Sequence, residues 1–176
     1  MIPAIGTIAG VVVLAIVVVA AIAATRPATM DIRRSIAIDA APDRVYALIS
    51  DLHRWPQWQP DDERDPAAAR SFGGPQSGVG TSSQWDGKRG AGSMRVTQAD
   101  PDRQVTVEVD FVRPFAAHNV NVLQLEPAAT ATNVTWSWHG QLPYVARVMG
   151  VFVDMNAALS KHFEGGLANL KALAER

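Results

Sequence analysis

The hydrophobicity pattern is dominated by an unbroken apolar run at the start of the chain. From Ile2 to Ala24 there is no charged side chain, and Thr7 carries the one hydroxyl group. As a helix rising about 1.5 Å per residue, this run reaches roughly 34 Å, enough to cross a hydrocarbon layer of about 30 Å. The run therefore predicts a single transmembrane helix.

A cleaved signal peptide is the main alternative for this run, with Ala21-Ile22-Ala23 as a small-residue cleavage site. Such a peptide has a basic region before an apolar core of about 7 to 15 residues, and no Lys or Arg precedes this run. A buried core helix would need a polar face, which the run lacks. We predict an uncleaved membrane anchor at residues 1–25, a linker at 26–30 and one domain at 31–176.

The first cations after the run are Arg26, Arg33 and Arg34. Basic residues beside a membrane helix favour the cytoplasmic side. The expected location is therefore the cell membrane, crossed once, with the domain in the cytoplasm.

Apolar and polar residues alternate through much of the remaining chain, as in β-strands with one buried face. A strand is expected at 31–39, a helix at 42–50, and a short helix or turn that buries Trp55 and Trp58. Short turns punctuate the β-rich stretch 65–139, and strands joined this way are antiparallel neighbours. The pattern predicts an antiparallel meander.

The end of the chain has helical periodicity, with a break expected near Gly150. One strand alters its alternation between Val122 and Leu123, which predicts a bulge or bend there. Gly165-Gly166 inside the last helix predicts a close approach to a strand or a small bend. Apolar residues every three or four positions form the stripe of this helix: Phe152, Met155, Leu159, Phe163, Leu167 and Leu170.

Five motifs then carry a resemblance to a known family. Three of them are Ile36-x-Ile38-x-Ala40-Ala41-Pro42-x-x-Val45-Tyr46, Asp51-x-x-x-Trp55-x-x-Trp58 and Phe163-x-x-Gly166-Leu167-x-x-Leu170-Lys171. The other two are Gly78-Val79-Gly80 before a strand that ends Trp85-x-Gly87, and Val134-Thr135-Trp136. In this order and spacing, the chain resembles the SRPBCC (START-like, helix-grip) superfamily, in its polyketide cyclase/dehydratase-like branch, over nearly all of residues 31–173.

The resemblance implies an α+β helix-grip fold, in which a curved antiparallel sheet of about six to seven strands wraps the long C-terminal helix. It also implies an apolar cavity between the sheet and the helix, which in relatives holds lipids, sterols, hormones or polyketide-like molecules. The superfamily contains enzymes as well as carriers and sensors, so the fold alone does not give the function.

Composition narrows the function classes. Lys and Arg number 16 against 17 Asp and Glu, which gives no electrostatic reason to expect nucleic acid as a partner. The absence of cysteine excludes thiol catalysis, disulfides and thiolate metal sites. No two histidines have close ligand spacing, so no metal is expected, and no motif indicates a cofactor.

The candidate ligand site is the inward face of the predicted sheet and helix. The same side chains would equally fill a solid core, and no cluster of titratable groups accompanies them. His118 and Arg113 are the candidates for catalysis. The predicted cavity lining consists of Trp85, Met94, Val107, Val109, Phe111, Trp136, Trp138, Phe152, Met155, Leu159 and Phe163.

Three functions follow as hypotheses. The leading one is a membrane-anchored module that binds a lipid-like or other apolar small molecule. The second is a polyketide cyclase/dehydratase-like enzyme in which His118 or Arg113 polarises a carbonyl, and the third is a structural or partner-binding domain with a filled cavity. The sequence leaves the oligomeric state open.

Overall fold

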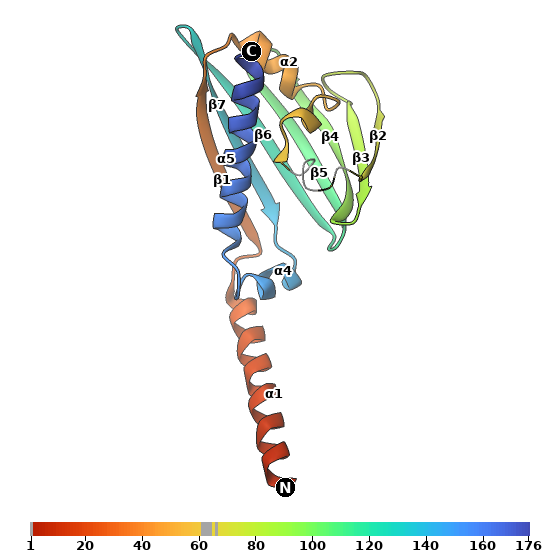
Figure 1. The fold of residues 1–176 in the computed structure, drawn as a ribbon, viewed down its shortest axis with the longest axis vertical. Helices are drawn as coiled ribbons and strands as arrows, with labels where there is room; N and C mark the ends of the chain where they lie inside the picture. Colours follow the sequence, from red (N-terminus) through yellow and green to blue (C-terminus); the bar gives the residue numbers. More distant parts are fainter. Residues whose placement is uncertain (1, 61–64, 66) are drawn as a thin grey trace.

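The chain consists of an apolar helix and a domain built from a sheet and helices (Figure 1). The computed structural model describes residues 2–60, 65 and 67–176. Helix α1 (Ile2–Thr25) projects from one end of the domain, which we call the foot. This architecture confirms the predicted α+β helix-grip class and the apolar helix before it.

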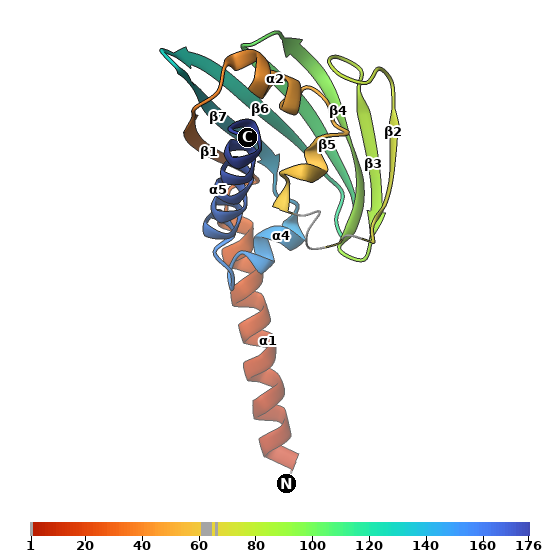
Figure 2. The ribbon, with the colours of Figure 1, turned by 45° about the horizontal axis from the view of Figure 1, so that its top comes forward.

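Seven antiparallel strands form a single sheet in the order β1-β7-β6-β5-β4-β3-β2. The sheet curls around the helices on its inner face (Figure 2). Its order follows the chain as a meander, except that β1 pairs with the last strand. The strands are β1 (Thr29–Ile38), β2 (Ala69–Gly73), β3 (Ser82–Gly87), β4 (Gly90–Asp100), β5 (Gln104–Arg113), β6 (Ala117–Ala128) and β7 (Ala131–Gln141).

The alternation within β6 corrects one prediction. The strand pairs with β5 and β7 without a register shift, so the bulge predicted between Val122 and Leu123 is absent from this strand. Leu123 faces inward with two asparagines, Asn119 and Asn121, whereas Val122 faces outward. The register shifts of the sheet lie in the pairing of β4 with β5 instead. The prediction was wrong because Val122 is an apolar residue on the outer face, whereas the inner face of this regular strand carries two polar residues.

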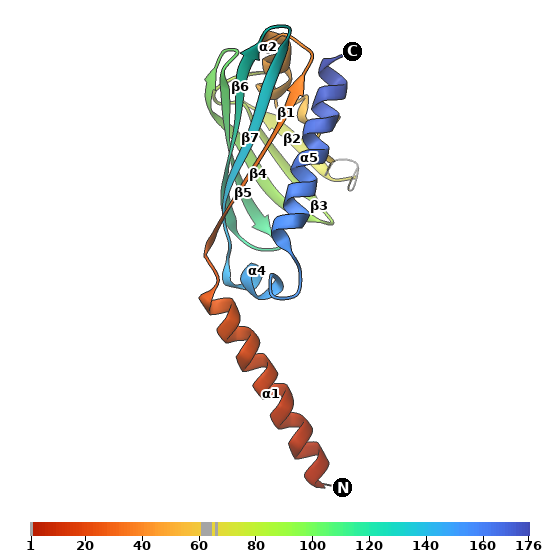
Figure 3. The same cartoon turned by 90° about the vertical axis from the view of Figure 1, so that its left-hand side faces the viewer.

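Helices cover the inner face of the sheet. Helix α2 (Pro42–Ile49) and the short 3-10 helix η1 (Trp55–Gln57) close one end, and α5 (Met155–Ala174) crosses the sheet against β1. Trp55 and Trp58 are buried, as predicted. Figure 3 shows the sheet edge-on, with α5 along one side and α1 leaving at the foot.

Gly166 allows the close approach that was predicted for α5. A Cβ at this position would lie 2.9 Å from the Trp136 ring, which is closer than side chains tolerate. The helical break near Gly150 is also confirmed, because α4 (Tyr144–Met149) ends there. The predicted stripe is wrong at Phe152, which precedes α5 and is 73 % exposed. Asp154 caps α5 by accepting a hydrogen bond from the Ala157 amide.

The connection from α1 to the sheet is shorter than the sequence suggested. Strand β1 begins at Thr29, two residues before the predicted start, so only Arg26–Ala28 separate it from α1. The Ala28 carbonyl accepts a hydrogen bond from the Leu142 amide at 2.7 Å. The end of α1 is thus held directly against the foot of the domain.

Candidate functional site

The centre of the inner face is an aromatic cluster. Trp136 lies edge-on to Phe163 with ring centroids 4.4 Å apart, and edge-on to Trp58 at 5.5 Å. All three side chains are buried. Trp136 and Phe163, both predicted cavity residues, therefore lie in a packed part of the core, where edge-to-face contacts stabilise the fold.

The remaining predicted lining is spread over the inner face and the foot. Val107 and Val109 are buried in the core, and Trp85, Met94, Trp138 and Leu159 are half-buried against it. Phe111 is 37 % exposed and contacts Trp85 edge-on. Phe152 and Met155 lie at the foot. Whether the full set contacts a ligand stays a prediction.

Buried polar atoms on this face lack hydrogen-bond partners among the described residues. They are Trp58 Nε1, Ser83 Oγ and Asn119 Oδ1. By contrast, Asn121 Oδ1 accepts a hydrogen bond from Trp136 Nε1 at 2.8 Å. Unpartnered buried polar atoms are uncommon, and a water or the polar end of a ligand would satisfy them. The two asparagines were missed from sequence, although counting back from Leu123 and Leu125 in steps of two places both on the inner face.

A hollow of about 620 Å³ opens at the foot, between the segment that follows α1, helix α4 and the start of α5. We call it the foot hollow. Its walls are mainly apolar, and they include Met30, Phe152 and Met155. Arg26 and Arg147 also line it. Ligand pockets commonly measure about 300 to 1,000 Å³ and combine an apolar wall with a few polar groups, so the foot hollow has the size and chemistry of a binding site.

A second hollow, of about 270 Å³, lies on the far side of the domain between α2, η1 and α5. Arg44, Arg54 and Gln57 contribute to its walls. It is below the usual volume of a small-molecule pocket, and it is the less suitable of the two.

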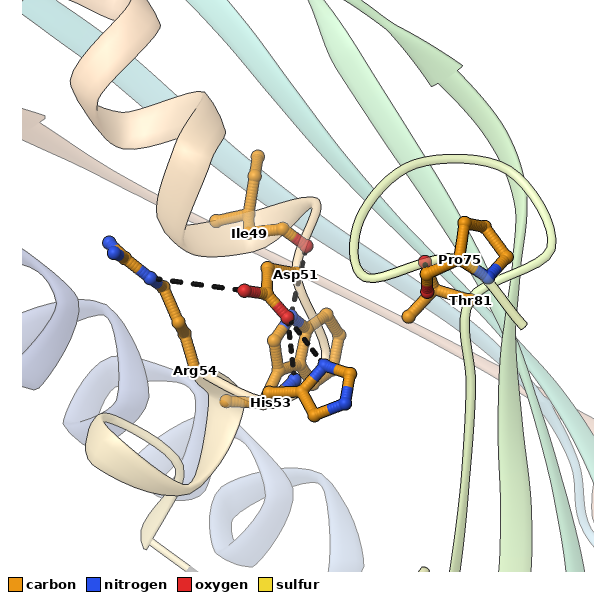
Figure 4. Close-up of polar contacts among 7 residues, drawn as sticks. Ile49, Asp51, His53, Arg54, Pro75 and Thr81 are labelled. Atoms are coloured by element: carbon orange, nitrogen blue, oxygen red, sulfur yellow. Dashed lines mark hydrogen bonds and ion pairs between the residues drawn. The ribbon is translucent and has the colours of Figure 1, made fainter. Parts of the chain in front are cut away.

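Asp51 is a buried carboxylate at the end of α2 (Figure 4). One of its oxygens lies 2.8 Å from His53 Nδ1 and accepts a hydrogen bond from the His53 amide at 2.9 Å. The Arg54 guanidinium lies 3.9 Å from the other oxygen, and the Phe72 ring stacks on His53 at 4.2 Å. Asp51 thus joins α2 to η1 through its contacts with His53 and Arg54.

The two candidate catalytic residues pair with exposed carboxylates. His118 lies on the outer face, 45 % exposed, with Nδ1 2.7 Å from Asp110 Oδ1. Arg113 forms an ion pair with Asp86 at the ends of β5 and β3. Neither residue lines the foot hollow. His139 is exposed, and its Nδ1 lies 2.7 Å from Asp31 Oδ1.

The pKa shifts lie away from the foot hollow. Burial raises the pKa of Tyr46 on α2 above 10.0, and the nearby Asp102 and Asp100 raise it further. At the end of α5, the hydrogen bond from Lys171 lowers the pKa of Glu175 below 4.5. Within the described part of the chain, His, Asp and Glu side chains form no group of three or more that could hold a metal ion.

A seven-stranded antiparallel sheet wrapped on a long C-terminal helix defines a helix-grip domain. Residues 29–175 match the family described as polyketide cyclase / dehydrase and lipid transport. The chain belongs to this family, which confirms the resemblance seen in its sequence. Membership makes the chain a ligand-binding or cyclase-like domain.

Solved structures share this fold at low identity. Protein CV1439 from Chromobacterium violaceum is 18 % identical with a TM-score of 0.60, covering 85 % of this chain and 99 % of that one. Major latex-like protein 151 from Panax ginseng is 16 % identical with a TM-score of 0.60, covering 85 % and 100 %. The Aha1 dimer from Colwellia psychrerythraea is 18 % identical with a TM-score of 0.56, covering 83 % and 96 %. A comparison with curated proteins finds no match.

Proposed function

We propose that this protein is a membrane-anchored module that binds a lipid-like or other apolar small molecule. The observation that carries the proposal is the foot hollow, which has about 620 Å³ of space and mainly apolar walls. It lies beside the end of the apolar helix, where a molecule dissolved in a bilayer would reach it. The family description, which includes lipid transport, supports the same class of ligand.

The character of α1 supports the anchor. Residues Ile8–Thr25 have a mean hydropathy of 2.9, and only 6 % of them are buried in the protein. Exposed Val and Ile side chains on every side of a helix are costly in water and favourable in lipid. Arg26, Arg33 and Arg34 follow the helix and favour a cytoplasmic domain.

Contacts between α1 and the domain favour an anchor over a cleaved leader. Tyr144 Oη on α4 donates a hydrogen bond to the Ala20 carbonyl at 3.0 Å, and Ala23 is fully buried. Cleavage after Ala23 would remove both partners from α4. A helix built into the domain in this way is expected to stay with it.

The cyclase/dehydratase-like alternative has less support, because its two candidate catalytic residues lie away from the foot hollow. His118 faces outward and Arg113 pairs with Asp86, so neither reaches the foot hollow. General acid-base catalysis needs a group within hydrogen-bond reach of the substrate. The filled-domain alternative remains the competitor, because the aromatic cluster around Trp136 occupies the centre of the inner face.

Native mass spectrometry and lipid extraction of the full chain, purified in mild detergent, would test the proposal. Val151→Trp enlarges a side chain in the wall of the foot hollow, and Val112→Trp makes the same change at an exposed site on β5. We expect a bound apolar molecule in the wild type and in Val112→Trp. Val151→Trp should reduce its occupancy about tenfold, which corresponds to about 1.4 kcal/mol.

Absence of any bound molecule, together with failure of pocket-sized dyes to bind, would support the filled-domain alternative instead. Equal occupancy in both tryptophan variants would place the ligand elsewhere in the domain, and the foot hollow would be rejected as the site.

A further inference from the structure

The foot carries an unusual set of exposed apolar side chains. We call residues 144–153, which comprise α4 and the turn after it, the foot segment. Val145 and Met149 are four residues apart and so share one face of α4. A soluble surface rarely gathers large apolar side chains in one short stretch without a partner. The exposed members are Tyr144 (44 %), Val145 (46 %), Met149 (50 %), Phe152 (73 %) and Val153 (52 %).

The position of the foot segment along α1 indicates what covers it. The hydrogen bond from Tyr144 reaches Ala20, five residues before the end of α1 at Thr25. At about 1.5 Å per residue, Tyr144 lies roughly 7 Å along the helix from its end. The interfacial layer on each side of a bilayer is about 5 to 7 Å thick. If α1 spans, α4 lies in this layer, where Tyr side chains are enriched.

Two cations accompany the apolar surface. Arg26 donates to the Gly150 carbonyl at 2.6 Å, and Arg147 donates to the Arg26 carbonyl at 3.3 Å. The Arg147 guanidinium also lies over the Tyr144 ring, and its buried Nε has no hydrogen-bond partner among the residues that the structure describes.

Neither guanidinium pairs with a carboxylate in the ranges that the structure describes. Asp154 also lines the foot hollow, and it is used as the cap of α5. The cations Arg26 and Arg147 therefore outnumber the acid at this edge, which suits the phosphate of an anionic lipid.

We infer that the foot segment, together with Arg26 and Arg147, is a docking surface for the anionic leaflet of a membrane. Its apolar side chains enter the interfacial layer, and the two guanidinium groups bind lipid phosphates. The inference rests on the proposed membrane anchor. It adds that the foot hollow opens toward lipid and not toward water, so that the domain has a fixed orientation on the bilayer.

The chain has no cysteine, so single-cysteine variants can be labelled without background. Full-length Phe152→Cys, Thr130→Cys and Val13→Cys would carry an environment-sensitive fluorophore in phosphatidylcholine–phosphatidylglycerol vesicles with quencher-bearing lipids. Thr130 lies in the β6–β7 turn at the other end of the sheet (Figure 1), and Val13 lies in α1. We expect quenching at positions 152 and 13 and none at 130.

Quenching at 13 but not at 152 would overturn the docking surface and leave the anchor intact. Loss of quenching at both positions would reject the anchor and this inference together. Quenching at both, without a co-purified ligand, would reject the proposed binding function and support the docking surface. The two proposals can therefore fail separately.

A second experiment on the full-length chain tests the role of Arg26 and Arg147. It measures how strongly the protein surface prefers spin-labelled phosphatidylglycerol to spin-labelled phosphatidylcholine. A basic residue near an anionic membrane contributes about 1 kcal/mol, so Arg26→Gln and Arg147→Gln should each lower this preference by up to roughly fivefold. The matched control is Arg103→Gln, an exposed residue in the turn before β5. Wild-type preference in both foot variants would overturn the role of the arginines.

Discussion

Trp136→Phe should destabilise the domain more than its apolar area alone explains. Trp136 is 2 % exposed, and its Nε1 is the donor to the buried Asn121 Oδ1. Phenylalanine cannot donate, so Asn121 keeps a buried acceptor without a partner, at a cost of about 1 to 3 kcal/mol. The smaller ring loses about 50 Å² of buried area, or about 1 kcal/mol at about 25 cal/mol per Å². The expected loss is about 2 to 4 kcal/mol.

A second variant separates the hydrogen bond from the packing. Asn121→Leu in the Trp136→Phe background removes the unpartnered acceptor and replaces it with an apolar group of similar size. Replacing both partners by apolar groups can be nearly neutral. The double variant should therefore recover about 1 to 2 kcal/mol relative to Trp136→Phe alone.

Urea unfolding of the full chain in detergent micelles, followed by far-ultraviolet circular dichroism, would measure these differences. This probe does not depend on the altered tryptophan. A loss below about 1 kcal/mol for Trp136→Phe, with strict additivity of the two substitutions, would refute the reasoning. It would mean that water already reaches Asn121, and that the centre of the inner face is open and not packed.

Three further outcomes are expected. Tyr144→Phe should remove the hydrogen bond to the Ala20 carbonyl and speed amide hydrogen exchange in α4 by up to about tenfold, while exchange in the core strands stays unchanged. His118→Ala should leave ligand occupancy, measured by native mass spectrometry, at the wild-type level, because His118 lies on the outer face. Glu175→Gln should lower the melting temperature at neutral pH but not in strong acid. Lys171 lowers the pKa of Glu175 below 4.5, so this stabilisation is complete above about pH 4.5 and is lost as the pH falls through the lowered value.

The sequence predicted those features of the fold that depend on local periodicity. Alternation placed Val107, Val109 and Trp136 on the inner face, and helical spacing placed Phe163 and Leu167 on one buried stripe. These patterns are set by the strand period of two and the helix period of 3.6, which each residue shares with its neighbours.

The periodicity misled at two places, the start of α5 and the middle of β6. Phe152 continues the stripe of α5 in sequence, but the helix begins only at Met155, after the cap at Asp154. In β6, the apolar pair Val122 and Leu123 suggested a defect, although the strand is regular and Asn121 occupies an inner position. A polar residue on a buried face can be recognised from sequence only after it is known which residues of the strand face inward.

The foot hollow was beyond prediction from sequence because its walls meet through long-range contacts. Arg26 and Arg147 are separated by 121 positions, and nothing in the local pattern of either indicates that they meet. Their proximity depends on the pairing of β1 with β7, which brings the residues just before one strand beside those just after the other. That pairing is the single exception to the meander order.

The pairing of β1 with β7 also bears on the proposed membrane anchor. A flexible tether would allow the domain to take any orientation near the membrane. Here three side-chain hydrogen bonds hold the end of α1 and Arg26 against the foot: from Tyr144 to Ala20, from Arg26 to Gly150, and from Arg147 to Arg26. Arg26 directly follows α1 and lines the foot hollow, so this residue connects the proposed anchor to the space proposed for a ligand. Loss of α1 would remove the Ala20 carbonyl that accepts from Tyr144, and it is therefore expected to loosen α4 beside the hollow as well as to release the domain from the proposed bilayer.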